Sequence, residues 1–147
     1  MADPASLQDV REILASARTI AVIGAHPTTW RPAFYVPDYL YGKGYRILPC
    51  HPRFADKGTE LWGESVRASV ADLGEPVDIV DVFRASGYVP EHLDEILAMD
   101  PRPKVVWLQL GIENHEVATA LRAEGITVVQ DRCTLADHRA LGLGPVA

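Results

Sequence analysis

The sequence contains few cysteines, and their scarcity excludes two kinds of small protein. Cys50 and Cys133 are the only cysteines among 147 residues, and they form no CxxC pair. A disulfide framework needs several cysteines, and a structural zinc site needs clustered ligands. We therefore expect no metal site and two reduced thiols, which are typical of a cytoplasmic protein.

Positive charge and long apolar runs are also scarce. Lys and Arg number 14 against 20 Asp and Glu, which gives a formal net charge of −6. Such a chain lacks the broad basic surface that binds nucleic acid or an anionic membrane, although a local cationic pocket could hold one small anion. No apolar run approaches the ~20 residues of a membrane span, and Met1-Ala2-Asp3-Pro4 carries acid where a signal peptide needs base. We predict a cytoplasmic protein without nucleic-acid or membrane partners, and the sequence leaves any protein partner open.

Val- and Ile-rich runs alternate with helical patterns, and 48% of the residues are hydrophobic, enough for one globular core. The predicted strands cover residues 19–24, 45–48, 77–82, 104–109 and 126–129. The predicted helices cover residues 7–17, 32–41, 89–99, 114–124 and 135–141, and residues 53–63 are expected to form a polar connection. Because most links exceed hairpin length, the pattern predicts an α/β fold. We expect a doubly wound, Rossmann-like, three-layer αβα domain over residues 1–147 with a parallel five-stranded sheet.

The first predicted strand stops at Gly24 and is followed by a helix that begins near Pro32. A strand that passes through glycine to a helix N-terminus presents free backbone N–H groups and a partial positive charge, which suit phosphate. In open parallel sheets, ligands bind beyond the carboxyl ends of the strands. The predicted ends are residues 24–31, 49–53, 82–86, 109–112 and 130–133. The sequence therefore predicts a nucleotide-type site at these ends.

The usual dinucleotide motif is incomplete, because only the first glycine of G-x-G-x-x-G is present, at Gly24. Where an NAD-binding domain places Asp or Glu after its second strand, this sequence has His51, Pro52 and Arg53. This pattern argues against NAD and favours a ligand with an extra phosphate on its ribose, such as NADP or coenzyme A. Arg53 is a candidate partner for that phosphate and Arg31 for a diphosphate, since guanidinium groups pair well with phosphate oxygens.

Several motifs occur in a fixed order between residues 14 and 138. They are Ile20-Ala21-Val22-Ile23-Gly24, Arg31-Pro32, Tyr39-Leu40, Gly44-Tyr45-Arg46, Pro49-Cys50-His51-Pro52-Arg53, Pro76-Val77-Asp78-Ile79-Val80-Asp81-Val82-Phe83-Arg84, Val106-Trp107-Leu108-Gln109-Leu110-Gly111-Ile112 and Asp131-Arg132-Cys133. In these motifs the chain resembles the small stand-alone CoA-binding proteins. It is similar in the same way to the Rossmann-type CoA-binding domain at the start of the succinyl-CoA synthetase α subunit. The resemblance implies that coenzyme A or an acyl-CoA is the ligand.

By this resemblance, three loops would hold the ligand. The first would cradle the diphosphate with Gly24, Ala25, His26, Pro27, Thr28, Arg31 and Pro32. The second would lie beside the adenosine and its phosphate with Pro49, His51, Pro52 and Arg53. The third would flank the pantetheine arm with Phe83 and Arg84. The family commonly has serine where Ala25 and Ala33 stand and asparagine where His51 stands, so His26, Thr28 and Thr29 would supply polar atoms in the first loop.

The resemblance implies binding and assigns no reaction. A ligase of the succinyl-CoA synthetase type needs a second domain with a phosphorylated histidine, and another subunit that binds nucleotide. These 147 residues hold neither, so we expect a CoA-binding protein that is not an enzyme and has no catalytic residue. Two alternatives stay open. One is a small NADP-dependent oxidoreductase, which the lack of a substrate domain disfavours, and the other is an interaction subunit with a vestigial nucleotide pocket.

Other residues with reactive side chains have plainer interpretations. We expect His92, His115 and His138 to be solvated helix residues. Asp81, near the end of its strand, is expected to cap a loop or pair with an arginine. Cys50 would be a nucleophile only as a thiolate with positive neighbours, and we expect it to be buried and inert.

Overall fold

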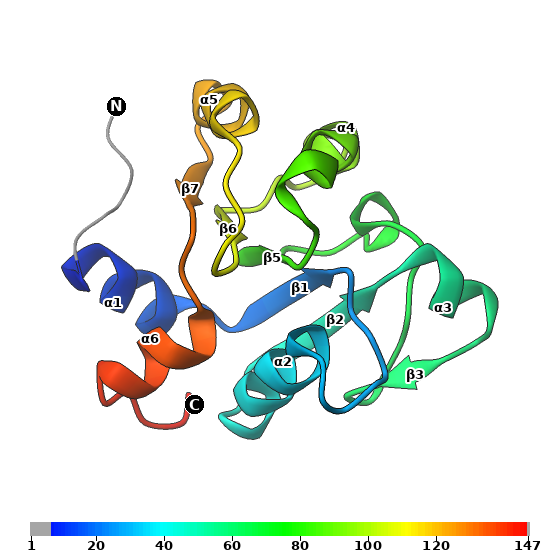
Figure 1. Cartoon of the computed structure of the whole chain (residues 1–147), viewed down its shortest axis with the longest axis horizontal. Coiled ribbons are helices and arrows are strands. Elements are labelled where there is room, and N and C mark those ends of the chain that lie inside the picture. The colour runs from blue at the N-terminus through cyan, green and yellow to red at the C-terminus, as the bar shows by residue number, and fades with distance from the viewer. Residues whose placement is uncertain (1–6, 147) are drawn as a thin grey trace.

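The computed structural model describes residues 7–146, and its centre is a five-stranded parallel sheet (Figure 1). The strands lie in the order β2-β1-β5-β6-β7. Their bounds are Thr19–Ile23 for β1, Arg46–Cys50 for β2, Ile79–Val82 for β5, Val105–Leu108 for β6 and Thr127–Val129 for β7. Each strand overlaps its predicted range, and the predicted doubly wound α/β fold is confirmed.

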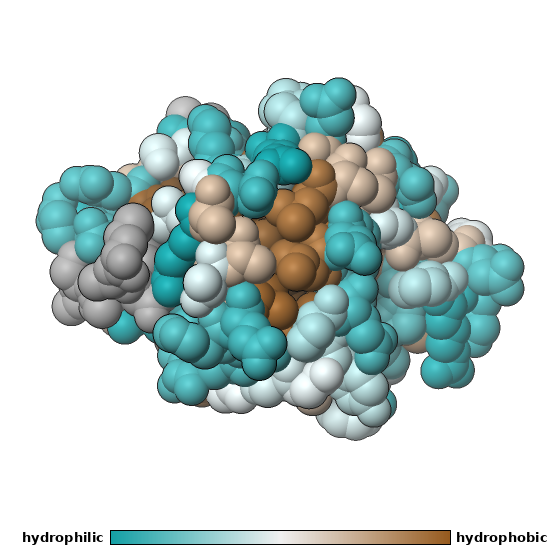
Figure 2. Space-filling model, turned by 90° about the horizontal axis from the view of Figure 1, so that it is seen from above, coloured by the Kyte–Doolittle hydropathy of each residue, from teal (hydrophilic) through white to brown (hydrophobic). Residues whose placement is uncertain are grey.

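Helices cover both faces of the sheet (Figure 1). One face, called the α6 face here, is covered by α1 (Leu7–Ser16), α2 (Pro32–Gly42) and α6 (Thr134–Ala140). The other, called the α5 face, is covered by α4 (Leu93–Leu97), α5 (His115–Ala123) and two 3₁₀ segments, η1 (Val70–Asp72) and η2 (Ser86–His92). Seen from above (Figure 2), hydrophobic residues are visible in a hollow with hydrophilic residues around it. The helices therefore leave part of the apolar interior open.

The strands bury both of their sides, which explains their near-continuous apolar sequence. All four residues of β5 and all four of β6 are buried. Because side chains alternate along a strand, Val80 and Val82 pack on the α5 face, whereas Ile79 packs on the α6 face. Trp107 of β6 faces the same way as Ile79 and is fully buried.

Residues 53–63 are more ordered than the predicted polar connection. Pro52 begins a short helix, α3 (Pro52–Asp56), because its fixed φ suits the first helical position. A small antiparallel pair follows, β3 (Glu60–Leu61) with β4 (Glu64–Ser65). The prediction was wrong here because elements of two to five residues are too short to show a hydrophobic period.

The predicted helix over residues 89–99 is also divided, since η2 ends at His92 and α4 begins at Leu93. Pro90 lies inside η2 and has no backbone N–H to donate. By contrast, α2 continues through Pro37 to Gly42. Proline therefore accompanies a divided helix at Pro90 but is accommodated within a continuous helix at Pro37.

The strand order reverses beside β1, which pairs with β2 on one side and with β5 on the other. In sheets with this order, the loops that leave the two strands at the reversal diverge and form a crevice in which ligands bind. The loops after β1 and β5 therefore define the place to look for a site. Within residues 7–146, no helix is both long and apolar enough to cross a membrane.

Candidate ligand-binding site

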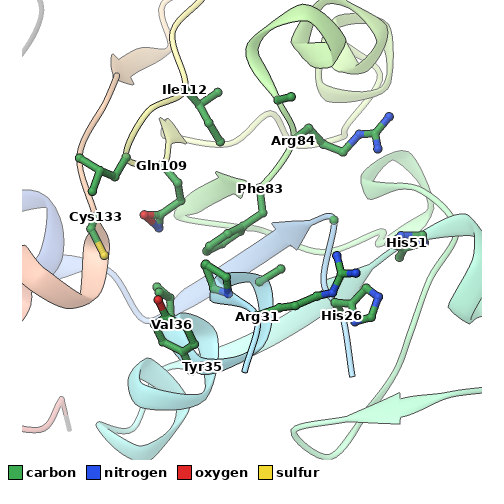
Figure 3. Close-up of a pocket in the computed structure, with 15 residues that line it drawn as sticks. His26, Arg31, Tyr35, Val36, His51, Phe83, Arg84, Gln109, Ile112 and Cys133 are labelled. Atoms are coloured by element: carbon green, nitrogen blue, oxygen red, sulfur yellow. The ribbon is translucent and has the colours of Figure 1, made fainter. Parts of the chain in front are cut away.

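A cavity of about 460 Å³ opens at the carboxyl ends of the strands, beside the point of reversal (Figure 3). Its volume lies in the usual range of small-molecule sites. Seven residues predicted from the sequence line it: Gly24, His26, Arg31, Pro32, His51, Phe83 and Arg84. Eight further residues complete the lining: Ala33, Tyr35, Val36, Ala85, Gln109, Leu110, Ile112 and Cys133. The structure therefore brings the first, second and third predicted loops to one cavity.

The other predicted residues lie outside the lining. They are Ala25, Pro27, Thr28, Pro49, Pro52 and Arg53. Ala25 is fully buried, and Arg53 is exposed on α3. Some of the lining residues that were not predicted fall at strand ends that the sequence does indicate: Ala85, Gln109, Leu110, Ile112 and Cys133. Tyr35 and Val36 have no such signal, since they lie inside a helix whose orientation the sequence does not reveal.

Gly24 allows the end of β1 to approach the end of β5 closely. Its φ is +88°, and a Cβ atom placed there would lie 2.7 Å from the carbonyl oxygen of Phe83. A side chain is therefore excluded both by the backbone conformation and by the contact. The amides of Gly24 and Ala25 both donate to the carbonyl of Cys50, at 3.0 and 3.3 Å. This joins the first loop to the second.

Pro37 helps to fix the first loop. Since proline has no N–H, the carbonyl of Ala33 receives no helical hydrogen bond from it, and the amide of His26 donates to that oxygen instead, at 3.4 Å. Arg31 is the N-cap of α2, and its side chain makes no capping bond. Within residues 7–146, the amides of residues 29, 30 and 33 have no hydrogen-bond partner. The unused donors therefore lie at the start of α2, whereas those of residues 24–26 are already bonded.

The two histidines of the cavity are held in the same way. Nδ1 of His26 accepts from the amide of Thr28 at 3.1 Å, and Nδ1 of His51 accepts from the amide of Arg53 at 3.2 Å. In a neutral imidazole the proton then lies on Nε2, which is left as a donor. Both rings pack against the buried ring of Phe54, with centroids 4.8 and 4.7 Å away. Sequence reasoning missed Phe54 because α3 itself was not predicted.

The surroundings of these histidines are electrically positive. Burial lowers the pKa of His26, and the nearby guanidinium groups of Arg31 and Arg53 lower it further. Burial also lowers the pKa of His51, with added repulsion from His26, Arg84 and Arg53. Burial disfavours charge of either sign, but the guanidinium groups that repel a further proton would attract an anion. We call the part of the cavity formed by His26, Arg31, His51 and Arg84 its cationic end.

Arg84 is held from behind by a polar chain. Its Nε donates to Nε2 of His92 at 3.2 Å, and Nδ1 of His92 pairs with the carboxylate of Glu95. Glu95 in turn accepts from the hydroxyl of Ser69 at 2.8 Å. The prediction that His92 is a solvated helix residue was wrong, because 14% of its side chain is exposed and both ring nitrogens are bonded.

A buried carboxyl group lies beneath the opposite end of the cavity. The amide nitrogen of Gln109 donates to both carboxyl oxygens of Asp81, at 2.9 and 3.0 Å, and the hydroxyl of Thr134 donates to one of them. Asp81 is fully buried, and burial raises its pKa to about 7 although the hydrogen bonds from Gln109 and Thr134 oppose this shift. The sequence suggested that Asp81 caps a loop or pairs with an arginine. That prediction was wrong, because its partners are Gln109 and Thr134. Its partners come from the residue that follows β6 and from α6, which are remote in sequence.

Three other expectations can be compared with the structure. Cys50 is 2% exposed, so the expected burial is confirmed, and burial raises the pKa of its thiol to about 12. His115 is exposed, as predicted, but His138 is fully buried and its Nδ1 lies 2.8 Å from the hydroxyl of Tyr39. Within residues 7–146, no three His, Cys, Asp or Glu side chains gather as a metal site would require.

The fold and the cavity place this chain among the single-domain, Rossmann-like α/β proteins. Residues 18–139 match the CoA binding domain family, and the chain belongs to that family. It is 32% identical over 133 residues to the uncharacterized protein YneT of Bacillus subtilis (strain 168), over 90% of this chain and 94% of that protein. The resemblance stated from the sequence is therefore confirmed.

Two solved structures are similar to this chain. Cell-free ID.343 from Thermus thermophilus is 51% identical, with a TM-score of 0.86 over 92% of this chain and 98% of that one. The dinucleotide forming acetyl-coenzyme A synthetase 1 of Ca. Korarchaeum cryptofilum is 20% identical, with a TM-score of 0.60 over 80% of this chain but 26% of that one. The second likeness shows the fold alone, as one part of a much longer protein.

Proposed function

We propose that this chain binds coenzyme A or an acyl-CoA in the cavity, with the phosphates at the cationic end. The observation that carries the proposal is the gathering of His26, Arg31, His51 and Arg84 around a cavity at the strand reversal, in a chain of the CoA binding domain family. The whole chain has a formal net charge of −6. The cationic end is therefore a local feature rather than part of a generally basic surface.

The diphosphate would meet several donors at this end. The unused amides of residues 29, 30 and 33 lie at the N-terminus of α2, where the helix dipole also favours an anion. Within residues 7–146, no carboxylate forms an ion pair with Arg31 or Arg53. Arg31 would therefore pair with the diphosphate and Arg53, beside His51, with the 3′-phosphate. His26 would add an Nε2–H donor.

The proposal assigns binding and no chemical step. A Tyr-x-x-x-Lys spacing of the kind expected in an NADP-dependent reductase does occur, at Tyr39 and Lys43. The hydroxyl of Tyr39 is bonded to His138, and neither residue of the pair lines the cavity. This placement supports a CoA ligand over a reductase site.

Calorimetric titration with CoA, dephospho-CoA and NADPH tests the ligand. We expect CoA to bind, and we expect loss of the 3′-phosphate to weaken binding by about 1.5–3 kcal/mol, the value of a charge-assisted hydrogen bond. Equal affinity for dephospho-CoA would remove the assigned role from Arg53. If NADPH binds and CoA does not, the proposal is refuted and the NADP-dependent oxidoreductase is favoured.

Arginine variants test the placement of the phosphates. Arg31→Ala should weaken CoA binding by about 1.5–3 kcal/mol because a direct phosphate partner is lost. Arg102→Ala is the matched control, since Arg102 pairs with Glu124 outside the cavity lining and should bind CoA like the wild type. If Arg31→Ala and Arg102→Ala bind CoA equally well, the phosphates lie elsewhere.

Binding of CoA should also be accompanied by proton uptake at the two cavity histidines. Burial and nearby positive charge lower the pKa of His26 and His51 in the free protein. A bound phosphate is a negative neighbour, so the pKa of each histidine should rise in the complex. The affinity for CoA should therefore increase as the pH falls from 8 to 6. The increase should be larger in the wild type than in the double variant that carries both His26→Gln and His51→Gln. The double variant is needed because the 3′-phosphate titrates in the same range. Parallel pH profiles would show that neither imidazole contacts the phosphates.

A further inference from the structure

The cavity has two chemically different ends. In Figure 3, His26, His51 and Arg84 lie on one side of Phe83, and Cys133, Gln109 and Ile112 lie on the other. The second side also receives Val36 from α2 and Leu110 from the loop after β6. We call it the apolar end. If the phosphates occupy the cationic end, the pantetheine arm and any acyl group extend to the apolar end.

The apolar end is built on bonded loops. The amide of Asp131 donates to the carbonyl of Ile112 at 3.1 Å, and the amide of Gly111 donates to the carboxylate of Asp131 at 2.6 Å. Leu110, which directly precedes Gly111, is 69% exposed. An exposed leucine on a fixed loop gains free energy when an apolar group covers it. This end therefore suits an aliphatic group.

The same end does not suit a negative charge. Both guanidinium contacts of Arg132 go to the carboxylate of Asp137, at 2.7 and 2.9 Å, so its charge is already balanced. The buried carboxyl of Asp81 lies beneath, and the carboxylate of Asp131 lies beside it. The uncharged polar groups of the lining here are Gln109 and the hydroxyl of Tyr35 (Figure 3). The amide nitrogen of Gln109 is already used by Asp81, and its oxygen accepts from the amide of Thr134. The terminal carboxylate of an acyl group bound at this end would be repelled by these acidic groups and would have no cation to pair with.

We propose that the site takes CoA thioesters with an uncharged aliphatic acyl group and discriminates against acyl groups that end in a carboxylate. The inference rests on the proposed CoA binding. The acyl chain lies against Val36, Leu110 and Ile112. Selectivity arises because a terminal carboxylate would lose its hydration without gaining a cationic partner.

Butyryl-CoA and succinyl-CoA provide a matched test, because their acyl chains have the same number of carbons and differ in the terminal carboxylate. By calorimetry we expect butyryl-CoA to bind about tenfold more tightly than succinyl-CoA, and more tightly than CoA itself. Equal or tighter binding of succinyl-CoA would overturn the inference while leaving CoA binding intact. Failure of all three to bind would instead refute the proposed function.

A charge introduced at the apolar end tests the cause. Leu110→Arg should reduce or reverse the preference for butyryl-CoA over succinyl-CoA, because it supplies the missing cation. Leu110→Gln is its matched control, which removes the apolar contact without adding charge and should not raise the affinity for succinyl-CoA. The side chain is exposed, so both variants should fold. An unchanged preference in Leu110→Arg would place the acyl group elsewhere.

Discussion

The two faces of the central sheet are both well buried, but they are built from different chemistry. On the α5 face the buried cluster is a continuous apolar core. The α6 face also has an apolar cluster, yet it holds the buried polar side chains of residues 7–146: Asp81, Gln109, Thr134, Asp137 and His138. Apolar packing fills space without fixing direction, whereas buried polar groups must meet specific partners.

These polar groups hold α6, which begins beside the cavity. Thr134 is bonded to Asp81 and Gln109, Asp137 to Arg132, and His138 to Tyr39 of α2. A helix of seven residues buries little apolar surface by itself, so directional bonds contribute more to its position. The comparison teaches that the α5 face mainly supplies stability, while the α6 face also sets the geometry of the site.

The largest effect should come from the α5 face. Leu121→Ala removes a fully buried side chain of α5 and should lower the free energy of unfolding by about 2–5 kcal/mol, since it leaves a cavity in the core. Urea denaturation measures the change. Leu110→Ala makes the same chemical change at an exposed position and should cost less than about 0.5 kcal/mol. Similar losses in both variants would contradict the assignment of stability to this face.

A smaller, pH-dependent effect is expected on the α6 face. Burial raises the pKa of Asp81 to about 7 from its ordinary value of 3.8, so the folded state holds the proton more tightly than the unfolded state between these values. Stability contributed by this group is therefore lost as the pH rises from 4 to 7. Asp81→Asn lacks the carboxyl group and should not show this loss. Between pH 4 and pH 8, the free energy of unfolding of the variant should therefore rise by roughly 1–3 kcal/mol relative to that of the wild type.

The comparison of Asp81→Asn with the wild type isolates this carboxyl group. His26, His51 and His138 have lowered pKa values and act in the opposite direction, but both proteins contain them. Urea denaturation at pH 4 and at pH 8 measures the difference. If the free energy of unfolding changes with pH equally in the two proteins, the pKa of Asp81 is not raised in the folded state.

A single hydrogen-bonding group of the α6 face should have a modest effect. Thr134→Val removes the hydroxyl that Asp81 and Gln109 share and should destabilise the fold by about 1 kcal/mol. Thr127→Val is the matched control on β7, where the residue is partly exposed and a change within about 0.5 kcal/mol is expected. If the two variants unfold at the same urea concentration, the hydroxyl contributes nothing to the network.

The smallest effect should come from the rim of the α5 face and should appear in ligand affinity. His92→Phe removes the acceptor that holds Arg84 and should weaken CoA binding roughly two- to tenfold. His92→Gln can still accept that hydrogen bond and should retain more of the affinity. In an Arg84→Ala background, His92→Phe should have no further effect. A persistent loss there would show that His92 acts independently of Arg84.

Much of the fold could be predicted from the sequence, because its signals are local. The strands are short apolar runs between turn residues, and Gly24 marks a turn that only glycine allows. The strand ends also located a large part of the cavity lining, including Arg31, His51 and Arg84. These predictions held because consecutive residues determine them.

The sequence by itself determined the α/β alternation, the glycine turn and the loops that carry cationic side chains, since propensity and periodicity act over neighbouring residues. Tertiary structure alone decided that Phe54 supports both cavity histidines, that Asp81 is buried with a raised pKa, and that His138 belongs to the interior. Each of these depends on which helix packs against which strand. Burial and partner choice between segments distant in the chain therefore produced the site's electrostatics, and no local pattern encodes them.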